Sequence, residues 1–441
     1  MAVTPAPAPG LLERLFQLQV RGTTVGTEVR AGVTTFMVMA YIIFVNPSIL
    51  SFSGVPGLES SGLPFAATMA ATCLTAGLLT IAMGLFANYP FAMAAGMGLN
   101  AVVAYQLVAG LKLSWPSAMG VIFVEGVIIA VLVLTRLREA IMEAIPLSLK
   151  RAISVGIGLF ILFIGLINAG FVKAGAPGGP PVALGDLVGT PVLVAVVGLI
   201  VTLGLITLRV KGALLLGIFI ATALAVLLNE LQGRQAFTTP GVAVLPSSIV
   251  APPDFSTIGQ FDLGVFAAIG VLSAVLIIFS IMLSDFFDTM GTVIGIGSEA
   301  GLLDEQGRLP RLRRVLFIDS LGAVFGGAAS ASSNTTYIES AAGVAEGGRT
   351  GLTSVVTGLL FLLALFFSPI AAIVPKEATA PALIIVGYLM ATLVRHIPFD
   401  DFAEGFPALM TIVVMPFTYS ITDGIGAGFI SYTAIRIARG E

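Results

Sequence analysis

Residues 330–343, SASSNTTYIESAAG, are polar or small, yet strongly apolar sequence lies on both sides of them. This position places the run at membrane depth, where backbone N–H and C=O groups must find partners within the protein. A Ser, Asn and Thr run makes a poor lipid-facing helix, and it is tolerated there as irregular or extended backbone that lines an enclosed cavity. Glu339 then lies where a half-helix would begin, beside backbone amides that a substrate would meet.

The composition of the whole chain indicates a polytopic membrane protein. Of 441 residues, 57% are hydrophobic and 10% are charged, whereas soluble proteins carry about 25% charged residues. The N-terminal MAVTPAPAPG lacks the basic flank and apolar run of a signal peptide. The single cysteine, Cys73, excludes an intrachain disulfide and a Cys-based metal site, and we expect no cofactor.

Apolar segments long enough to span a bilayer follow an N-terminal stretch, 11–22, whose pattern predicts an interfacial helix. The third and tenth segments are too polar or too rich in glycine to be ordinary continuous helices. The predicted segments number fourteen: 31–51, 64–87, 90–110, 117–135, 151–171, 191–208, 212–231, 265–291, 313–329, 332–347, 351–374, 379–396, 404–419 and 421–437.

The distribution of basic residues predicts the orientation. With both termini in the cytoplasm, 17 of the 21 Lys and Arg residues fall on the cytoplasmic side, as the positive-inside rule requires. The loops 172–190 and 232–263, rich in Pro, Gly and small polar residues, would be irregular covers on the outer side. The charged loop 298–314 would be a cytosolic connector.

Fourteen segments divide into two halves of seven, and because seven is odd the halves would be inverted relative to each other. The third segment carries a Gly-rich patch, AMAAGMGLN at 92–100, and the tenth carries SSNTTYIES at 332–340. The two patches occupy the same place in each half. Paired interrupted segments at corresponding positions point to a transporter binding site.

Acids inside the membrane are costly and mark functional sites. Asp285 and Asp288, in LSDFFDTMG at the end of a long apolar helix, share a helix face at i and i+3. Two carboxylates at such a short distance do not both ionise easily, and a carboxyl group that keeps its proton suits a proton carrier. Alternatively, either residue could meet the membrane interface or cap a neighbouring helix. The same reasoning, that an acid inside the membrane marks a functional site, applies to Glu339, and the small residues after it leave room for a ligand. Glu125, in VIFVEGVII, has no polar neighbours and is better explained by pairing within the core.

Two further polar residues are candidate substrate ligands. Asn100 ends the Gly-rich patch of the third segment and offers both a donor and an acceptor. If the two interrupted segments face each other, Asn100 lies near Glu339, and the alternative is a helix-capping role. Thr336 contributes a hydroxyl from the polar run of the tenth segment.

The residues of the site favour a flat, neutral heterocycle with ring N–H donors and carbonyl acceptors. No basic residue lies among the candidates, which disfavours a fully charged anion. A carboxylate that accepts a ring N–H makes a directional, charge-assisted contact. Phe286, Phe287 or Tyr337 could stack on such a ring, although helix or lipid packing is the simpler role for any one of them.

Several motifs place these residues in a known family. NTTYIES resembles the NTTYxE motif of the nucleobase–ascorbate (nucleobase:cation symporter-2) transporter superfamily. From about residue 20 to its end, the chain is similar to the azaguanine-type hypoxanthine/guanine/adenine permeases. The stretches that carry this resemblance are TEVRAGVTTFMVMAYIIFVNPSIL (27–50), AMAAGMGLNAVVAY (92–105), IPLSLKRAISVGIGLFILFIGLINAG (145–170), SDFFDTMGTVIG (284–295) and TDGIGAGFISY (422–432).

The resemblance implies an all-α polytopic fold of fourteen transmembrane segments in two inverted seven-segment repeats. Short strands in segments 3 and 10 would meet in mid-membrane. A core domain and a gate domain, the latter often dimerising, would follow an N-terminal interfacial segment. The implied boundaries are 1–26 for that segment, 27–140 and 261–376 for the core, and 141–260 and 377–441 for the gate.

The motifs also carry the family's site residues onto this chain. Asp285 matches the acid of the eighth segment, Glu339 the acid of the tenth and Asn100 the amide of the third, while Asp288 matches the second acid of the purine branch. Uracil-type relatives have a His one turn after the eighth-segment acid. Here that position is Thr289, which fits the purine branch and weakens a pyrimidine or His-relay hypothesis.

The sequence therefore predicts a multi-pass protein of the cell membrane that imports purine nucleobases (hypoxanthine, guanine and adenine) with protons. The core would slide against the gate in an elevator-like motion, Asp285 and Glu339 would hold the ring, and one of the acids would carry the proton. We expect contact with lipid, a homodimer through the gate and no nucleic acid partner.

Four other functions compete with this prediction. A uracil or xanthine carrier, or a sulfate or bicarbonate carrier, would share the architecture, and the acids of the site stand against the anion carriers. An intramembrane aspartyl protease would need a GxGD motif and a partner Asp placed centrally in a second span, and neither is found. A scaffold without transport activity would not need buried acids. We therefore expect a transporter and not an enzyme.

Overall fold

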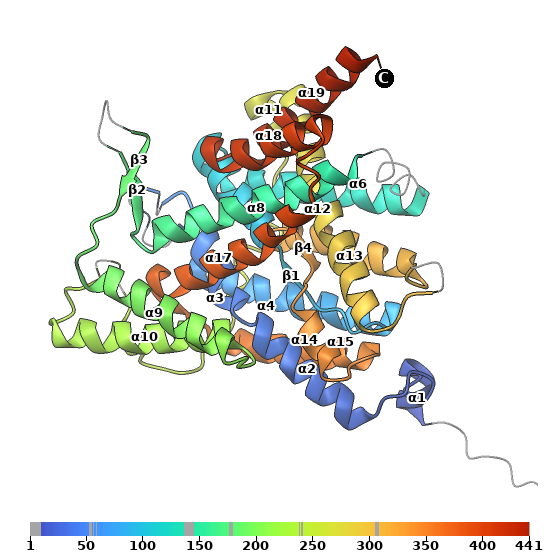
Figure 1. Ribbon diagram of the computed structural model, residues 1–441. Coiled ribbons are helices and arrows are strands. Elements are labelled where there is room, and N and C mark those ends of the chain that lie inside the picture. Colours follow the sequence, from blue (N-terminus) through green and yellow to red (C-terminus); the bar gives the residue numbers. More distant parts are fainter. Residues whose placement is uncertain are drawn as a thin grey trace, which may run out of the picture.

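The computed structural model describes residues 10–440 apart from 53, 54, 56, 59, 136–144, 176–179, 238, 240 and 305–307 (Figure 1). The start of the N-terminal segment, the predicted core–gate boundary at 140/141, and two of the basic residues counted for orientation, Arg136 and Arg138, lie outside the described residues.

Each of the fourteen predicted segments corresponds to helical elements, and segments 3 and 10 also contain the two short strands that the resemblance implies. In chain order the elements are α2 (Val25–Met39) with α3 (Ile42–Leu50); α4 (Phe65–Ala82) with η1 (Met83–Ala87); β1 (Met93–Ala95) with α5 (Met97–Ala101) and η2 (Val102–Gly110); α6 (Trp115–Thr135); α8 (Leu147–Asn168); α9 (Thr190–Thr207); α10 (Ala213–Leu231); α11 (Val265–Ile269) with α12 (Val271–Glu299); α13 (Leu312–Ala329); β4 (Asn334–Thr336) with α14 (Ser340–Ala345); α15 (Gly351–Ala364) with η3 (Leu365–Phe367) and α16 (Ser368–Ala372); α17 (Lys376–Ala391) with η4 (Thr392–His396); α18 (Phe402–Thr418); and α19 (Ile421–Arg439). Within the described part of the chain, nine helices are long and apolar enough to cross a membrane.

The eighth segment is longer than predicted. α12 continues to Glu299, so Asp285 and Asp288 lie in the middle of the helix and not at its end. The glycines after residue 290 favour an earlier end, but Val293 and Ile296 are fully buried in an apolar cluster that includes Leu309. Packing of this face outweighs the cost of glycine in a helix, which is about 1 kcal/mol per residue.

Two shorter elements also differ from the prediction. The N-terminal helix α1 covers only Leu11–Phe16, because Gln17 adopts a left-handed conformation with φ 57° that ends it. The loop 172–190, predicted to be irregular, contains an antiparallel hairpin of β2 (Val172–Ala174) and β3 (Val182–Leu184).

The two interrupted segments meet at a pair of antiparallel strands. Met93 of β1 lies opposite Thr336 of β4, and Ala95 lies opposite Asn334. All residues of both strands are buried. The pairing continues past the strands, because the Gly96 amide donates to the Ser333 carbonyl at 2.8 Å. The strands thus satisfy their backbone polar groups inside the protein, as a membrane interior requires.

Helix packing follows the inverted repeat. α4 packs on α15, and their counterparts α13 and α6 pack on each other. Both contacts depend on glycine: a Cβ at Gly358 would lie 2.5 Å from the Gly77 carbonyl oxygen, and one at Gly126 would lie 2.4 Å from the Val324 nitrogen. Glycine and other small residues allow membrane helices to approach this closely.

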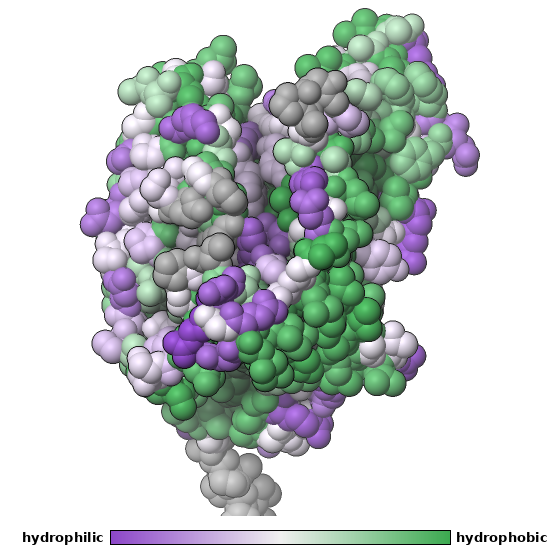
Figure 2. All heavy atoms as spheres, turned by 90° about the vertical axis from the view of Figure 1, so that its left-hand side faces the viewer, coloured by the Kyte–Doolittle hydropathy of each residue, from purple (hydrophilic) through white to green (hydrophobic). Residues whose placement is uncertain are grey.

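The outer surface is largely apolar. Figure 2 looks onto the side of the molecule that carries β2, β3, α9 and α10 in Figure 1, and it shows a broad hydrophobic area beside scattered hydrophilic residues. On α9 and α10, large side chains such as Ile200 and Leu227 are more than half exposed. A surface of this kind suits contact with lipid, in agreement with the predicted multi-pass membrane protein.

Candidate functional site

A cavity of about 80 Å³ lies where the β1–β4 strand pair meets α12. This volume exceeds the roughly 10–15 Å³ that one water needs, so the cavity can hold a small molecule. Its walls come from six of the predicted segments. The lining residues are Tyr41, Gly96, Met97, Gly98, Leu99, Ile157, Ser284, Asp288, Thr292, Thr336, Tyr337, Ile338, Glu339, Val386 and Met390.

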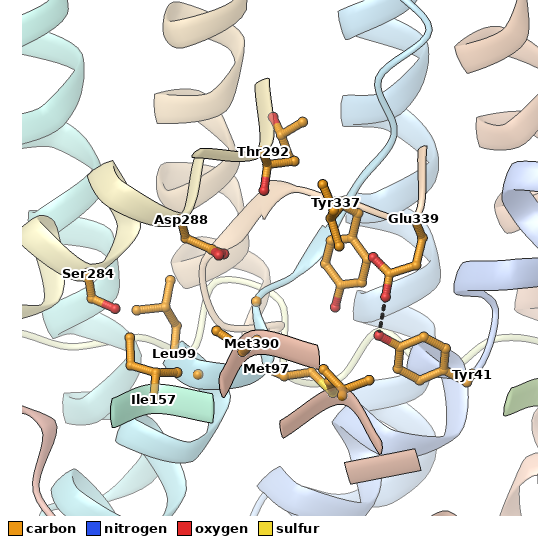
Figure 3. Close-up of a pocket in the computed structure, with 15 residues that line it drawn as sticks. Tyr41, Met97, Leu99, Ile157, Ser284, Asp288, Thr292, Tyr337, Glu339 and Met390 are labelled. Atoms are coloured by element: carbon orange, nitrogen blue, oxygen red, sulfur yellow. Dashed lines mark hydrogen bonds between the residues drawn. The ribbon is translucent and has the colours of Figure 1, made fainter. Parts of the chain in front are cut away.

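Two carboxylates face this cavity from different elements (Figure 3). Asp288 projects from the middle of α12, and Glu339 lies at the N-cap of α14, as predicted for the start of a half-helix. Glu339 Oε1 accepts a hydrogen bond from the Tyr41 hydroxyl at 2.6 Å. Asp288 Oδ2 accepts a longer one from Thr335 Oγ1 at 3.4 Å. Each carboxylate therefore keeps acceptor capacity for a ligand.

Tyr41 is a site residue that the sequence analysis missed. The first span is interrupted between α2 and α3, and Tyr41 lies at this interruption, where its side chain is fully buried. Its hydroxyl reaches Glu339 from there (Figure 3). In the sequence, Tyr41 is a polar aromatic residue inside an otherwise apolar segment. This pattern is too common to identify a site residue.

Two further contacts shape the wall of the cavity. Gly98 lies against Ile157 of α8, and a Cβ there would come within 2.5 Å of Ile157 Cγ2. Tyr337 lines the cavity between the two acids, and its hydroxyl donates to the Ala95 carbonyl at 2.5 Å. This bond fixes the Tyr337 ring against β1, so that one ring is available as a rigid wall for a flat ligand.

Behind β4 lies a second row of acids that the strand separates from the cavity. Asp285 is buried and accepts from Ser333 Oγ at 3.1 Å. Asp319 of α13 is also buried, and its Oδ1 accepts from both the amide nitrogen and Oγ1 of Thr336, at 3.2 and 3.1 Å. Thr289 Oγ1 lies 2.8 Å from Asp319 Oδ2 and 3.4 Å from Asp285 Oδ1. These acids fix the position of β4 and with it the wall of the cavity.

Asp319 was also missed, and it corrects one argument made from the sequence. A second span does place an Asp beside Asp285, although the sequence analysis found none. The signal was present as a lone acid in LFIDSLGAV of the ninth segment. The hydroxyl-rich motif drew attention to the tenth segment, and only the fold shows that Asp319 lies beneath it.

The predicted substrate ligands fall into two groups. Asp288, Thr336 and Glu339 line the cavity. Asp285 and Asn100 do not. Asn100 is fully buried in α5, and neither of its side-chain polar atoms has a hydrogen-bond partner among the described residues.

The charged residues among the described cavity lining are all acidic. The described lining residues include two acids and no Lys, Arg or His. No group of three His, Cys, Asp or Glu side chains within the described ranges could hold a metal ion. The cavity can therefore offer carboxylate acceptors, hydroxyl groups and an aromatic face to a small ligand.

A polytopic helical fold, in which two interrupted segments meet at an acid-lined cavity, defines a membrane transporter. The family model described as "Permease family" matches residues 26–426. The chain belongs to this family, within the nucleobase permease superfamily that its motifs predicted. It is a transporter and not an enzyme.

Two curated relatives match over nearly the whole chain. The adenine permease AdeP of Escherichia coli (strain K12) is 42% identical over 438 residues, which are 99% of this chain and 93% of the relative. The guanine/hypoxanthine permease PbuG of Bacillus subtilis (strain 168) is 40% identical over 431 residues, 98% of this chain and 95% of the relative.

Solved structures share the fold at low sequence identity. The transmembrane domain of the cyanobacterial bicarbonate transporter BicA superposes with a TM-score of 0.64 at 15% identity, over 91% of this chain and 97% of that one. This likeness confirms the predicted fold class.

Proposed function

We propose that this permease imports purine nucleobases, namely adenine, guanine and hypoxanthine, across the cell membrane together with protons. The observation that carries the proposal is the cavity in which Asp288 and Glu339 face the same space beside Tyr337. The names of relatives such as AdeP and PbuG support the choice of purines.

The proposed contacts follow from the chemistry of the ring. A purine presents N–H donors at its edge, and a carboxylate accepts them in charge-assisted hydrogen bonds. Glu339 and Asp288 would accept from two edges of the ring, while Tyr337 packs against its face. The acidic lining would repel bicarbonate or sulfate, so the shared fold of BicA does not favour an anion as substrate here.

The proton would travel on an acid of this same site. Glu339 is the candidate that faces the cavity directly, and Asp285, the second predicted carrier, lies behind β4, where Ser333 links it to the strand. A carboxyl that holds a proton in the loaded state and releases it in the cytoplasm would couple uptake to the proton gradient. Protonation also lowers the cost of moving the site through the membrane.

The proposed motion is an elevator-like sliding of a core (27–140 and 261–376) against a gate (141–260 and 377–441). With these boundaries both bodies would line the cavity, since Asp288 and Glu339 fall within the proposed core and Ile157, Val386 and Met390 within the proposed gate. The gate wall is apolar, so it can slide past a substrate that is held by polar groups of the core. We propose that the gate also forms the homodimer contact.

We also propose an orientation in the membrane, which the arrangement in Figure 1 supports. Helix α1 and the C-terminus both lie on the right-hand side of Figure 1, below and above, and the β2–β3 hairpin lies on the left-hand side. We propose that the side carrying the termini is cytoplasmic, because this orientation puts 17 of the 21 Lys and Arg residues on the cytoplasmic side, whereas the reverse orientation would put them outside, against the positive-inside rule.

The test is uptake of radiolabelled adenine, guanine and hypoxanthine by cells that lack their own carriers. Asp288→Asn and Glu339→Gln should each reduce uptake at equal surface expression, and Glu377→Gln, a change to an acid outside the cavity lining, should not. A protonophore should abolish accumulation. Wild-type uptake by both cavity variants would refute the site. Competition by uracil as strong as that by purines would refute the substrate class.

A further inference from the structure

A second hollow lies away from the substrate cavity, at the N-terminal end of α13. It has a volume of about 680 Å³. One part of its wall is apolar, with Phe86, Phe317 and Leu321, and the other part is formed by Arg311, Arg313 and Arg314, all of which are exposed.

This hollow continues along α13 into an apolar groove. A neighbouring cavity of about 430 Å³ shares Phe86 and Leu321 with it and extends to Phe325. At a rise of about 1.5 Å per residue, the distance along the helix from Arg314 to Phe325 is about 17 Å. This is close to half of the roughly 30 Å hydrocarbon core, the thickness of one leaflet.

Two of the three arginines are held in place by hydrogen bonds to backbone carbonyls. Arg313 Nη2 donates to the Leu134 carbonyl at 2.8 Å, and Arg314 Nη1 donates to the Phe86 carbonyl at 3.3 Å. A guanidinium carries five N–H donors, so each of these bonds uses only one of them. The described residues that line the hollow include no carboxylate. Three guanidinium groups therefore line one end of the hollow, and most of their N–H donors remain available for an anionic ligand.

We propose that this groove, the α13 groove, binds one anionic phospholipid. The phosphate lies among Arg311, Arg313 and Arg314, and an acyl chain follows α13 towards Phe325. Charge complementarity selects an anionic headgroup, because basic pockets between helices on the cytoplasmic side attract such lipids. A soluble phosphate ester would leave the apolar part of the groove unused.

The site also touches the substrate machinery through one helix. Ile318 lines the α13 groove, and the next residue, Asp319, holds Thr336 of β4. Occupancy of the groove would therefore brace the helix that positions the substrate cavity. The proposal does not depend on the identity of the substrate.

A binding experiment on the purified full chain in neutral detergent tests the headgroup. Thermal unfolding is followed during titration with phosphatidylglycerol, phosphatidylcholine of the same acyl chains, and glycerol phosphate. Phosphatidylglycerol alone should raise the melting temperature. Replacement of Arg311, Arg313 and Arg314 by Gln should weaken this binding about 100-fold, since each of the three cations near a membrane surface contributes about fivefold.

The matched control replaces three exposed cations outside the groove lining, Arg14, Arg209 and Arg395, by Gln. It should bind phosphatidylglycerol as the wild type does. An equal loss in the control would overturn the proposal in favour of a diffuse charge effect. An equal response to glycerol phosphate would show a phosphate site without a lipid, and an equal response to phosphatidylcholine would show no headgroup selection; either result overturns it.

A fluorescence experiment tests the acyl chain, because Trp115 is the single tryptophan of the chain. In a Trp115→Phe background, Leu321→Trp places a reporter in the groove, and Ile220→Trp places one on the exposed apolar surface of α10. Lipids brominated on the acyl chain quench nearby tryptophan. Brominated phosphatidylglycerol should quench the Leu321 reporter more than brominated phosphatidylcholine, and both should quench the Ile220 reporter equally. Equal quenching at Leu321 would contradict the proposal.

Discussion

Removal of the Asp319 carboxylate should weaken substrate binding, even though this residue does not line the cavity. Its Oδ1 accepts from the Thr336 amide and Oγ1, and its Oδ2 accepts from Thr289 Oγ1. Thr336 is the last residue of β4 and lines the cavity. Without Asp319, the strand end loses the acceptor that fixes it on the side opposite to the substrate.

The three contacts set the size of the effect. In Asp319→Ala the two threonine hydroxyls can turn to other acceptors, but the Thr336 N–H remains buried without one. An unsatisfied buried donor costs about 1–3 kcal/mol, and the lost hydrogen bonds to the carboxylate add roughly 1 kcal/mol. The total cost of Asp319→Ala is therefore about 2–4 kcal/mol. In Asp319→Asn the amide oxygen can keep the Thr336 contacts, and the loss falls to about 1 kcal/mol.

These free energies translate into affinity if β4 must be reordered when substrate binds. A cost of about 1.4 kcal/mol is a tenfold loss, so the Ala variant should bind about 30-fold to several hundred-fold more weakly and the Asn variant about fivefold. The assay is equilibrium binding of labelled purine to purified protein, with surface expression and melting temperature measured in parallel. Asp262→Asn is the matched control, because Asp262 also accepts two hydrogen bonds but lies outside the cavity lining.

The expected order of affinity is wild type, then Asn, then Ala. An Ala variant that folds and binds purine as tightly as the wild type would refute the positioning role of Asp319. An Asn variant as weak as the Ala variant would show that the negative charge matters more than the hydrogen-bond geometry.

Two further predictions concern stability. Glu28 is fully buried, and both of its carboxylate oxygens accept backbone amides: Oε2 accepts from Thr350 and Thr353 at 3.2 Å each, and Oε1 accepts from Arg349 at 2.9 Å. In Glu28→Gln one oxygen becomes an NH2 group that cannot accept, so the change should cost about 2–4 kcal/mol and lower the melting temperature, whereas Glu13→Gln on α1 should not. Equal melting temperatures would contradict this capping role. Gly351→Ala should abolish folded protein in size-exclusion profiles, because its Cβ would lie 1.9 Å from the Gly84 carbonyl oxygen of η1. Gly426→Ala, with no atom within 4 Å of its Cβ, should be tolerated. A monodisperse Gly351→Ala protein would show that α15 and η1 can separate at little cost.

The sequence determined the membrane class and the layout of the chain. A low charged content, fourteen apolar segments and the paired interruptions at 92–100 and 332–340 follow from local composition, because a bilayer imposes its constraint on every segment separately. Glu339 at the start of a half-helix follows from the same local reasoning, and the structure confirms it.

The tertiary structure alone decided which acids share a space. Asp288 and Glu339 face one cavity while Asp285, only three residues from Asp288, lies behind β4, because α12 continues through the site and presents its successive faces to different neighbours. Tyr41 lines the cavity and Asp319 holds its wall from behind, although no sequence pattern singled out either residue. Their roles arise from contacts between residues about 20 to 300 positions apart in the chain, and no local pattern encodes such contacts.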